Sequence, residues 1–316
     1  MRWPFRRQEP ATPAAPPPVA HHAPPPRHHP TGSDADHVRE IAAAHLSEPD
    51  LSRWLGLLRP AVRLHTTNDA DAVVARLGGL PRLPDDVEWP TWSGHGPLSY
   101  VGELDCERLA GFHLDIPFPS TGRLLFFYRD GSYDSDPETV GTWDAATLEG
   151  ARALHVDDGS PREAPAGTTT YPEQRYAGRS VVTAPDWQHP DLEAAFTSPG
   201  QDAASLMEHP VTADAFTEEL RARHHGPGHQ VGGYADPIQG PVEQEVALAA
   251  LANQVRHGDP RLEEEAGRWE LLLQVDTDDD LEMMWGDIGT LYWMTRGDQP
   301  WSAASAAEVL FTWQCS

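Results

Sequence analysis

The sequence has little of what marks secreted or membrane proteins. Its 316 residues include only two cysteines, Cys106 and Cys315, and neither lies in a CxxC or Cys/His metal pattern. A framework of several disulfides is excluded by count, so a reducing compartment fits. No apolar run reaches the length of about 18 residues that a membrane span needs. The first ten residues carry arginines but no apolar core of a secretion signal, and we expect a cytoplasmic protein.

Basic residues are also few. There are 23 arginines and lysines against 49 aspartates and glutamates, which gives a formal net charge of -26. Such a surface repels nucleic-acid phosphates and anionic lipid head groups, so we expect neither nucleic acid nor membrane as a partner. Cationic partners are favoured, and a basic protein or peptide is the partner that we expect. The same acidity would also serve solubility without any partner.

Common catalytic motifs are missing as well. No P-loop, dinucleotide fingerprint or nucleophile elbow occurs in the sequence. The two Gly-Gly elements do not lead directly into a helix, so they are not phosphate-binding loops. We therefore expect no cofactor, and we consider an enzyme less well supported than a binding protein.

What is present divides the chain into three parts. Residues 1–32 are rich in proline, alanine and histidine, and their scarcity of apolar side chains predicts a disordered tail. Its four paired histidines do not by themselves predict a metal site. Residues 33–59 show helical spacing, with Ser33 as the expected cap of the first helix. Residues 60–316 hold the predicted strands and further helices.

An internal repeat organises residues 60–316. In each half a Gly-Gly loop precedes a strand ending in Glu/Gln-x-Asp, and a Gly-x-Leu strand follows. The segments are 77–81, 98–105 and 121–126 in the first half, and 231–235, 269–276 and 288–293 in the second. This shared order predicts halves of about 60–183 and 184–316 that pack pseudo-symmetrically around one core. The expected fold class is α+β, with an internally duplicated, mostly antiparallel β-sheet core and peripheral helices.

Four of these segments carry a family resemblance. The stretches GGLPRLPDDVEWP, LSYVGELD, HQVGGYADPIQ and LLLQVDTDDDLEMMWGDIGTLYW resemble the bacterial YwqG-like family, a domain of unknown function. The resemblance covers residues 60–315 and implies a cytoplasmic α+β domain with internal duplication and no established activity. The chain departs from the family pattern at 102–105, where Gly-Glu-Leu-Asp replaces the expected Ala-Gln-Ile/Leu-Asp, so Glu103 adds a carboxylate.

Four polar side chains at strand ends give the sharpest site hypothesis. Glu103 and Asp105 are two apart on one strand and so share a face. Gln274 and Asp276 occupy the equivalent places in the second half. Should the halves meet there, the four groups would line a pocket suited to acid/base chemistry or to a small ligand. The simpler interpretation is that these residues only finish their strands.

Three more residues complete the candidate pocket. His229 follows Gly-Pro-Gly, and the sequence offers no further ligands that would make it a zinc site. Trp285 is either a stacking wall or a core anchor. Asp287 is either a ligand acceptor or a turn residue. The core and turn interpretations are favoured for this pair.

The acidic turn after the second-half strand invites a calcium interpretation. Asp276, Asp278, Asp280 and Asp287 fall at positions 1, 3, 5 and 12 of a calcium-loop template. Leu281, however, stands where that template needs glycine, and a strand precedes the loop instead of a helix. We expect a solvated turn and no metal site.

Two functions follow from these observations. The first is a non-enzymatic cytoplasmic protein that holds a basic protein or peptide, with immunity-like neutralisation of a basic toxin as one form. The second is a small-ligand or metal-dependent enzyme with a carboxylate-lined pocket between the two repeats. Convergence of Glu103, Asp105, Gln274 and Asp276 in one cavity would favour the enzyme.

Overall fold

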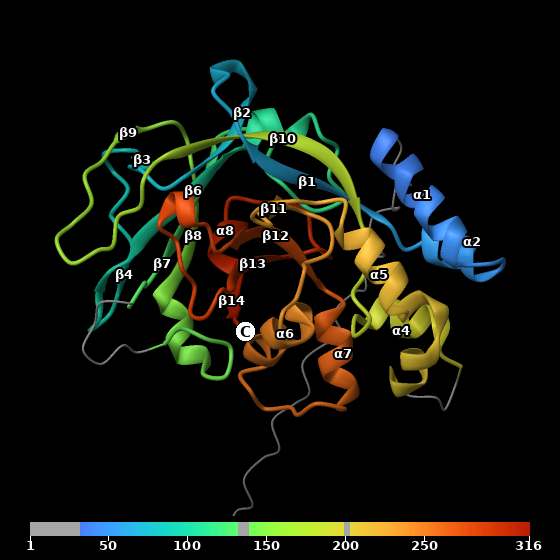
Figure 1. Cartoon of the computed structure of the whole chain (residues 1–316). Helices are drawn as coiled ribbons and strands as arrows, with labels where there is room; N and C mark the ends of the chain where they lie inside the picture. The colour runs from blue at the N-terminus through green and yellow to red at the C-terminus, as the bar shows by residue number, and fades with distance from the viewer. Residues whose placement is uncertain (1–31, 132–138, 199–202) are drawn as a thin grey trace, which may run out of the picture.

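A computed structural model describes residues 32–131, 139–198 and 203–316. They form a mixed helix and strand fold around one ten-stranded sheet, which curves into a nearly closed, barrel-like shape (Figure 1). The strand order is β14-β13-β12-β11-β1-β10-β2-β6-β7-β8, with antiparallel neighbours throughout. The predicted mixed class with a mostly antiparallel sheet is confirmed. The predicted tail lies outside the described residues, except for Gly32.

The main sheet combines long and short strands. Its members are β1 (Arg59–Thr66), β2 (Val73–Leu77), β6 (Ser99–Asp105), β7 (Arg123–Tyr128), β8 (Ala151–Val156), β10 (Gln174–Thr183), β11 (Gln230–Val231), β12 (Trp269–Asp276), β13 (Thr290–Arg296) and β14 (Leu310–Gln314). Two short ladders lie beside it, formed by β3 (Arg82–Leu83) with β9 (Ser160–Pro161), and by β4 (Thr91–Trp92) with β5 (Gly96–Pro97).

Short helices surround the sheet. The α-helices are α1 (Ser33–His45), α2 (Asp50–Leu55), α3 (Cys106–Ala110), α4 (Pro190–Phe196), α5 (Asp214–Arg221), α6 (Val242–Ala250), α7 (Pro260–Ala266) and α8 (Ser305–Glu308). The 3-10 turns are η1 (Ala70–Ala72), η2 (Ala145–Gly150), η3 (Ala203–Glu208), η4 (Pro210–Thr212) and η5 (Asp279–Leu281). None of the helices in the described ranges combines the length and apolar character that crossing a membrane requires.

The centre of the sheet is the β1–β10 pair. The two strands run antiparallel from Arg59 opposite Thr183 to Thr66 opposite Tyr176. Outward from β10 come β2, β6, β7 and β8, and outward from β1 come β11, β12, β13 and β14. The predicted repeat segments therefore lie on opposite sides of this central pair.

The strands outward from β10 (the first arm) and those outward from β1 (the second arm) show the same pattern of strand pairing. In the first arm Asp105 lies opposite Arg123, and the β6–β7 register shifts at Val101. In the second arm Asp276 lies opposite Thr290, and the β12–β13 register shifts at Leu272. The irregularity, which bends a strand and increases its twist, thus falls four residues before the strand-end aspartate in each arm.

The Gly-Gly loops also match in conformation. Gly78 and Gly79 have φ values of 67° and 73°, and Gly232 and Gly233 have φ values of 69° and 71°. A side chain would be strained at each position. A Cβ at Gly78 would in addition lie 2.0 Å from the carbonyl oxygen of Pro172. Glycine is therefore required where β2 and β11 leave the sheet.

Aromatic side chains fill the inside of the curved sheet. Phe126 on β7 packs edge-on against Trp293 on β13, with ring centroids 5.1 Å apart. Tyr128 on β7 stacks on Phe311 of β14 at 5.0 Å. These contacts join strands near opposite edges of the sheet, so the closure of the sheet follows from packing across its interior.

A helical cap of α1, α2, α4 and α5 covers the outer end of β10, at the right of Figure 1. Its apolar core includes Trp54 and Phe216, whose rings meet edge-on at 5.0 Å. Ser33 is the first residue of α1 and not its cap, since Gly32 takes the cap position without a side-chain bond. Asp34 instead fastens α1 to the sheet by accepting a hydrogen bond of 2.8 Å from the Val182 N–H.

A second helical layer, α6 and α7, packs on the outer face of β12 and β13. Its contacts include Val246 from α6, Leu262 from α7, Leu271 from β12 and Tyr292 from β13.

Candidate functional site

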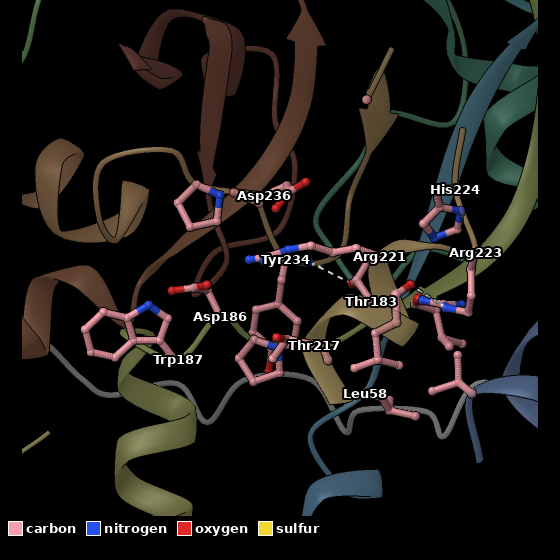
Figure 2. A pocket seen from close by; sticks show the side chains of 18 of the residues that line it. Leu58, Thr183, Asp186, Trp187, Thr217, Arg221, Arg223, His224, Tyr234 and Asp236 are labelled. Carbon is pink, nitrogen blue, oxygen red and sulfur yellow. Dashed lines mark hydrogen bonds between the residues drawn. The ribbon is translucent and has the colours of Figure 1, made fainter. Parts of the chain in front are cut away.

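A cleft of about 580 Å³ lies between the helical cap and the sheet (Figure 2). Residues of β1, β11 and the end of β10 form its sheet side, and residues of α1, α2 and α5 form its cap side. Its volume is within the range of about 300–1,000 Å³ typical of ligand pockets. It is the first candidate for a functional site in the described part of the chain.

The cap end of the cleft is apolar. Trp54, Leu58, Val182, Val211 and Leu220 line it and belong to the core of the helical cap. These side chains are held by that packing and provide a preformed hydrophobic wall. The rim adds exposed apolar side chains, since Trp187 is 39% exposed and Met207 is 69% exposed.

Arg63 enters the cleft from the middle of β1. Its flanking residues Val62 and Leu64 are buried in the core. The Nε atom of Arg63 is buried and has no hydrogen-bond partner among the described residues. Burial lowers the pKa of Arg63, while Asp236 and Asp276 favour its charged form. A guanidinium is thus held in the cleft with donor capacity unused.

His224 lines the same cleft, three residues after α5. Its Nδ1 atom is buried and has no partner within the described part of the chain. Burial, together with the nearby charges of Arg63 and Arg223, lowers the pKa of His224 to about 4. The imidazole is therefore uncharged at neutral pH, with Nδ1 buried and unpaired.

Arg223 is already occupied. Its Nη1 atom donates to both carboxylate oxygens of Asp34 at 3.1 Å, and Nη2 donates to the Val182 carbonyl at 3.4 Å. This contact joins the loop after α5 to α1 and to β10. Arg223 therefore holds the cleft wall together, whereas Arg63 and Arg221 form no hydrogen bond or ion pair with another described residue.

Asp236 faces Arg63 and Arg221 from the loop after the second Gly-Gly element. Its backbone is fixed on both sides, because its N–H donates to Gln274 Oε1 at 3.0 Å and its carbonyl accepts from the Tyr292 hydroxyl at 2.8 Å. The carboxylate has no hydrogen bond or ion pair with the rest of the described chain. Partial desolvation inside the concave cleft raises the pKa of Asp236, although Arg221 and Arg63 oppose that shift.

The predicted candidates of the second half lie at the edge of this cleft. Asp276 lines it, with Oδ2 accepting from the Gly228 N–H at 2.8 Å and Oδ1 from the Thr290 hydroxyl at 2.9 Å. Gln274 lies behind the lining, where its Nε2 donates to the Gly228 carbonyl at 2.9 Å. Both side chains hold the loops that carry Gly228 and Asp236.

His229 is closed off from the cleft. It is 1% exposed, and its Nδ1 accepts a hydrogen bond from the Asp276 N–H at 3.1 Å. The ring proton must then be on Nε2, which donates to Asp278 Oδ2 at 3.1 Å. The Tyr176 hydroxyl donates to the same oxygen at 3.2 Å. His229 therefore fastens the acidic turn to the barrel interior.

Asp278, the buried carboxylate of this turn, makes its hydrogen bonds to other residues of the described chain. Besides His229 and Tyr176, Asp278 accepts from the Asp280 N–H at 2.9 Å and begins the η5 turn. Within the described ranges, no three histidine, cysteine, aspartate or glutamate residues are grouped so as to hold a metal ion. The histidines of the tail, at 21, 22, 28 and 29, lie outside those ranges.

The predicted candidates of the first half form a separate cluster. Glu103 is 1% exposed and accepts hydrogen bonds from Arg123 at 2.8 Å, Arg76 at 3.2 Å and the Tyr100 hydroxyl at 3.3 Å. Asp105 accepts from the Arg108 N–H at 3.1 Å and caps α3. Both line a cavity of only about 70 Å³.

Trp285 and Asp287 lie away from both cavities. Trp285 is buried, donates from Nε1 to the Asp276 carbonyl at 3.2 Å and packs edge-on against Tyr128 and Tyr171. Asp287 is exposed in the following turn. Their surroundings are those of a core anchor and a turn residue.

The four strand-end residues are divided between two places. In the sheet, β6 and β12 are separated by β11, β1, β10 and β2. Glu103 and Asp105 line the small cavity, and Asp276 lines the large cleft. The structure therefore brings together each pair, but it does not bring the two pairs together.

Sequence reasoning did not single out Arg63, Arg221, His224 or Asp236. One signal was present in the sequence. Arg63 stands between Ala61-Val62 and Leu64 in an apolar strand, where a charged side chain is uncommon unless it has a partner. The other cleft residues come from chain segments too far apart for spacing to connect them.

Fold and site together define an α+β protein with a preformed, ligand-sized cleft beside a barrel-like sheet. Residues 75–315 match the family model described as Domain of unknown function (DUF1963), and the chain belongs to that family. No curated protein matches the sequence.

Proposed function

We propose that this protein is a binding protein without catalysis of its own, and that the cleft holds its ligand. One observation carries this proposal. Arg63 and Asp236 lie in the same open cleft of about 580 Å³, and neither side chain has a hydrogen bond or ion pair with another described residue. Buried donors such as Arg63 Nε are normally paired, whereas the Asp236 carboxylate is exposed in the cleft, so a ligand that reaches both is the natural partner.

The energetics support the same proposal. An unpaired buried donor costs about 1–3 kcal/mol. The fold keeps Arg63 despite that cost, although its neighbours in the strand are apolar. A ligand acceptor that reaches the guanidinium recovers this free energy on binding, and the exposed Trp187 and Met207 at the rim add apolar burial.

A panel of small charged probes tests the cleft. Saturation-transfer NMR with phenylacetate and phenethylamine is expected to detect binding of at least one probe to the wild-type protein. The phenylacetate signal should be lost or strongly reduced in Arg63→Gln, and the phenethylamine signal in Asp236→Asn. Arg175 is exposed on β10 and lies outside the cleft, so Arg175→Gln is the matched control. Equal loss in Arg175→Gln, or no binding of either probe, would contradict the proposal.

A second candidate is capture of a basic protein or peptide, with an immunity-like role as one form. The observation that favours it is the net charge of -26, which speeds encounter with cationic partners. A pull-down from native lysate is expected to recover a stoichiometric basic protein, and its association rate should fall steeply with salt. Recovery only of neutral or acidic proteins would count against it.

A small-ligand or metal-dependent enzyme with a carboxylate-lined pocket is the less well supported alternative. It requires Glu103, Asp105, Gln274 and Asp276 around one pocket, whereas these residues lie in two separate places. The geometry that motivated that enzyme is therefore lacking.

We also propose that the two arms of the sheet arose by internal duplication and that the chain belongs with the YwqG-like proteins of its family. The shared strand order, the matching register shifts and the two positive-φ Gly-Gly loops support a duplication. A cytoplasmic location is part of the same proposal. Aligned relatives that carry both Gly-Gly loops and both strand-end aspartates would support the duplication, and their independent variation would oppose it.

A further inference from the structure

The cleft contains both kinds of charge. Asp186 and Trp187 lie on one side in Figure 2, Arg223 and His224 lie on the opposite side, and Arg221 lies between them. Asp236 stands above Asp186 in the same view. Arg63 and Asp236 act on each other's charge, so a ligand in the cleft meets acidic and basic groups together.

The basic side has the donors for one carboxylate. Arg63 Nε and His224 Nδ1 are both buried without a partner in the described chain, and the two groups interact electrostatically. A planar carboxylate matches the guanidinium fork. A phosphate would bring a second negative charge beside Asp236 and Asp276, which already act on Arg63. The surroundings thus favour a singly charged oxyanion.

The Asp236 carboxylate forms no direct pair with a cation. It has no hydrogen bond or ion pair within the described ranges, although the charges of Arg221 and Arg63 act on it more strongly than those of Asp186 and Asp276. A primary ammonium offers three donors and one positive charge, which is what such a group of carboxylates accepts.

The body of the ligand must be apolar. Trp54, Leu58 and Val182 form part of the wall at the cap end, and Trp187 and Met207 stand exposed at the rim. Trp54, Leu58 and Val182 are at most 7% exposed, so the apolar surface that a ligand can cover is chiefly that of Trp187 and Met207. The volume of about 580 Å³ accommodates a molecule of several residues' size but not a folded domain.

We propose that the cleft binds a small zwitterion with an apolar body, of the class of short apolar peptides. Its carboxylate lies at Arg63 and His224, and its ammonium group lies at Asp236. This inference rests on the proposed binding function and adds the chemical class of the ligand. It assigns opposite ends of the ligand to two different residues, so each assignment can be tested separately.

Calorimetry with L-leucyl-L-phenylalanine and two capped analogues tests the proposal. The analogues are the N-acetyl form, which lacks the ammonium group, and the C-terminal amide, which lacks the carboxylate. The wild-type protein is expected to bind the free dipeptide at least tenfold more tightly than either analogue. Equal binding of all three would overturn the proposal without depending on any variant.

Two variants then assign the ends. In Arg63→Gln the preference for the free carboxylate over the amide should disappear, while the preference for the free ammonium remains. In Asp236→Asn the reverse is expected. Arg175→Gln and Asp287→Asn, both exposed and outside the cleft, are the matched controls and should keep both preferences. Loss of both preferences in one variant, or loss in a control, would overturn the assignment.

The result also separates this inference from the proposed function. Suppose that phenylacetate binds through Arg63 while the dipeptide binds no better than its capped forms. The cleft is then a binding site, and the zwitterion class is wrong. If neither the single-charge probes nor the dipeptide binds, both proposals fail.

Discussion

The Nε2 atom of His229 lies 3.1 Å from Oδ2 of Asp278 in the barrel interior, and the direction of this hydrogen bond is fixed by the other ring nitrogen. Because Nδ1 accepts from the Asp276 backbone, Nε2 is the donor. The histidine thereby joins the end of β12 to the acidic turn.

Replacing His229 by alanine is expected to destabilise the fold by about 3 kcal/mol. The change leaves the Asp276 N–H and the Asp278 carboxylate without their buried partner. Urea unfolding measures the effect. His225→Ala, at an exposed neighbouring position, should change the free energy of unfolding by less than about 0.5 kcal/mol. Equal effects would contradict the structural role of His229.

The same contact predicts acid sensitivity. The hydrogen bond from His229 is the largest cause that lowers the pKa of Asp278 from its ordinary value of 3.8. A carboxyl group with a lowered folded-state pKa stabilises the fold above its unfolded value and loses that contribution as pH falls through the folded value. Stability should therefore drop below pH 3.8, and Asp278→Asn should flatten that drop. An unchanged profile would count against this account.

Glu103 holds a charge cluster in the first arm. Glu103→Gln removes the buried charge that pairs with Arg76 and Arg123, so we expect a loss of about 3 kcal/mol in unfolding free energy. The substitution places in the first arm the residue type that stands at Gln274 in the second. Glu88→Gln, at an exposed position, is the control. Chemical denaturation measures both, and a neutral Glu103→Gln would show that the arginines need no buried carboxylate.

His224 gives the cleft its own pH dependence. Its pKa is lowered from 6.5 to about 4, chiefly by burial, so the unfolded chain binds the proton more readily between these values. Stability should then be full above pH 6.5 and fall by about 2 kcal/mol toward pH 4, solvent in the cleft screening part of the shift. His224→Gln should remove this slope. A ring that titrates near 6.5 by NMR would contradict the desolvated environment.

The sequence predicted much of the fold because the repeat segments carry register information. The alignment of Asp105 with Asp276 matches the strand pairing, in which each lies at the end of its ladder. The Gly-Gly loops were predicted from the steric freedom of glycine, and all four residues have positive φ. Local chemistry of this kind depends only on neighbouring residues.

The convergence of the two halves could not be predicted in the same way. Equivalent residues of a repeat can lie at a shared axis or far from it, and the outcome depends on what occupies the axis. Here β1 and β10 pair with each other at the centre, so β6 and β12 are displaced to opposite arms. Glu103 and Gln274 therefore occupy matching positions that lie apart.

The cleft was beyond sequence reasoning for a related reason. Its residues come from α1, β1, the end of β10, the loop after α5 and the loop after β11. No periodicity links positions such as 38, 63, 182, 224 and 236. Only the helical cap, which packs through contacts distant in the chain, brings them together.

The most direct test of the account is the ¹⁵Nε–¹Hε NMR signal of Arg63 during titration with L-leucyl-L-phenylalanine. In the free protein this Nε–H is buried and has no partner in the described chain. If the ligand carboxylate binds the guanidinium, the signal should shift downfield in proportion to saturation and exchange more slowly with water, while the signal of Arg175, exposed outside the cleft, stays in place. Saturable binding that leaves the Arg63 signal unmoved would contradict the account.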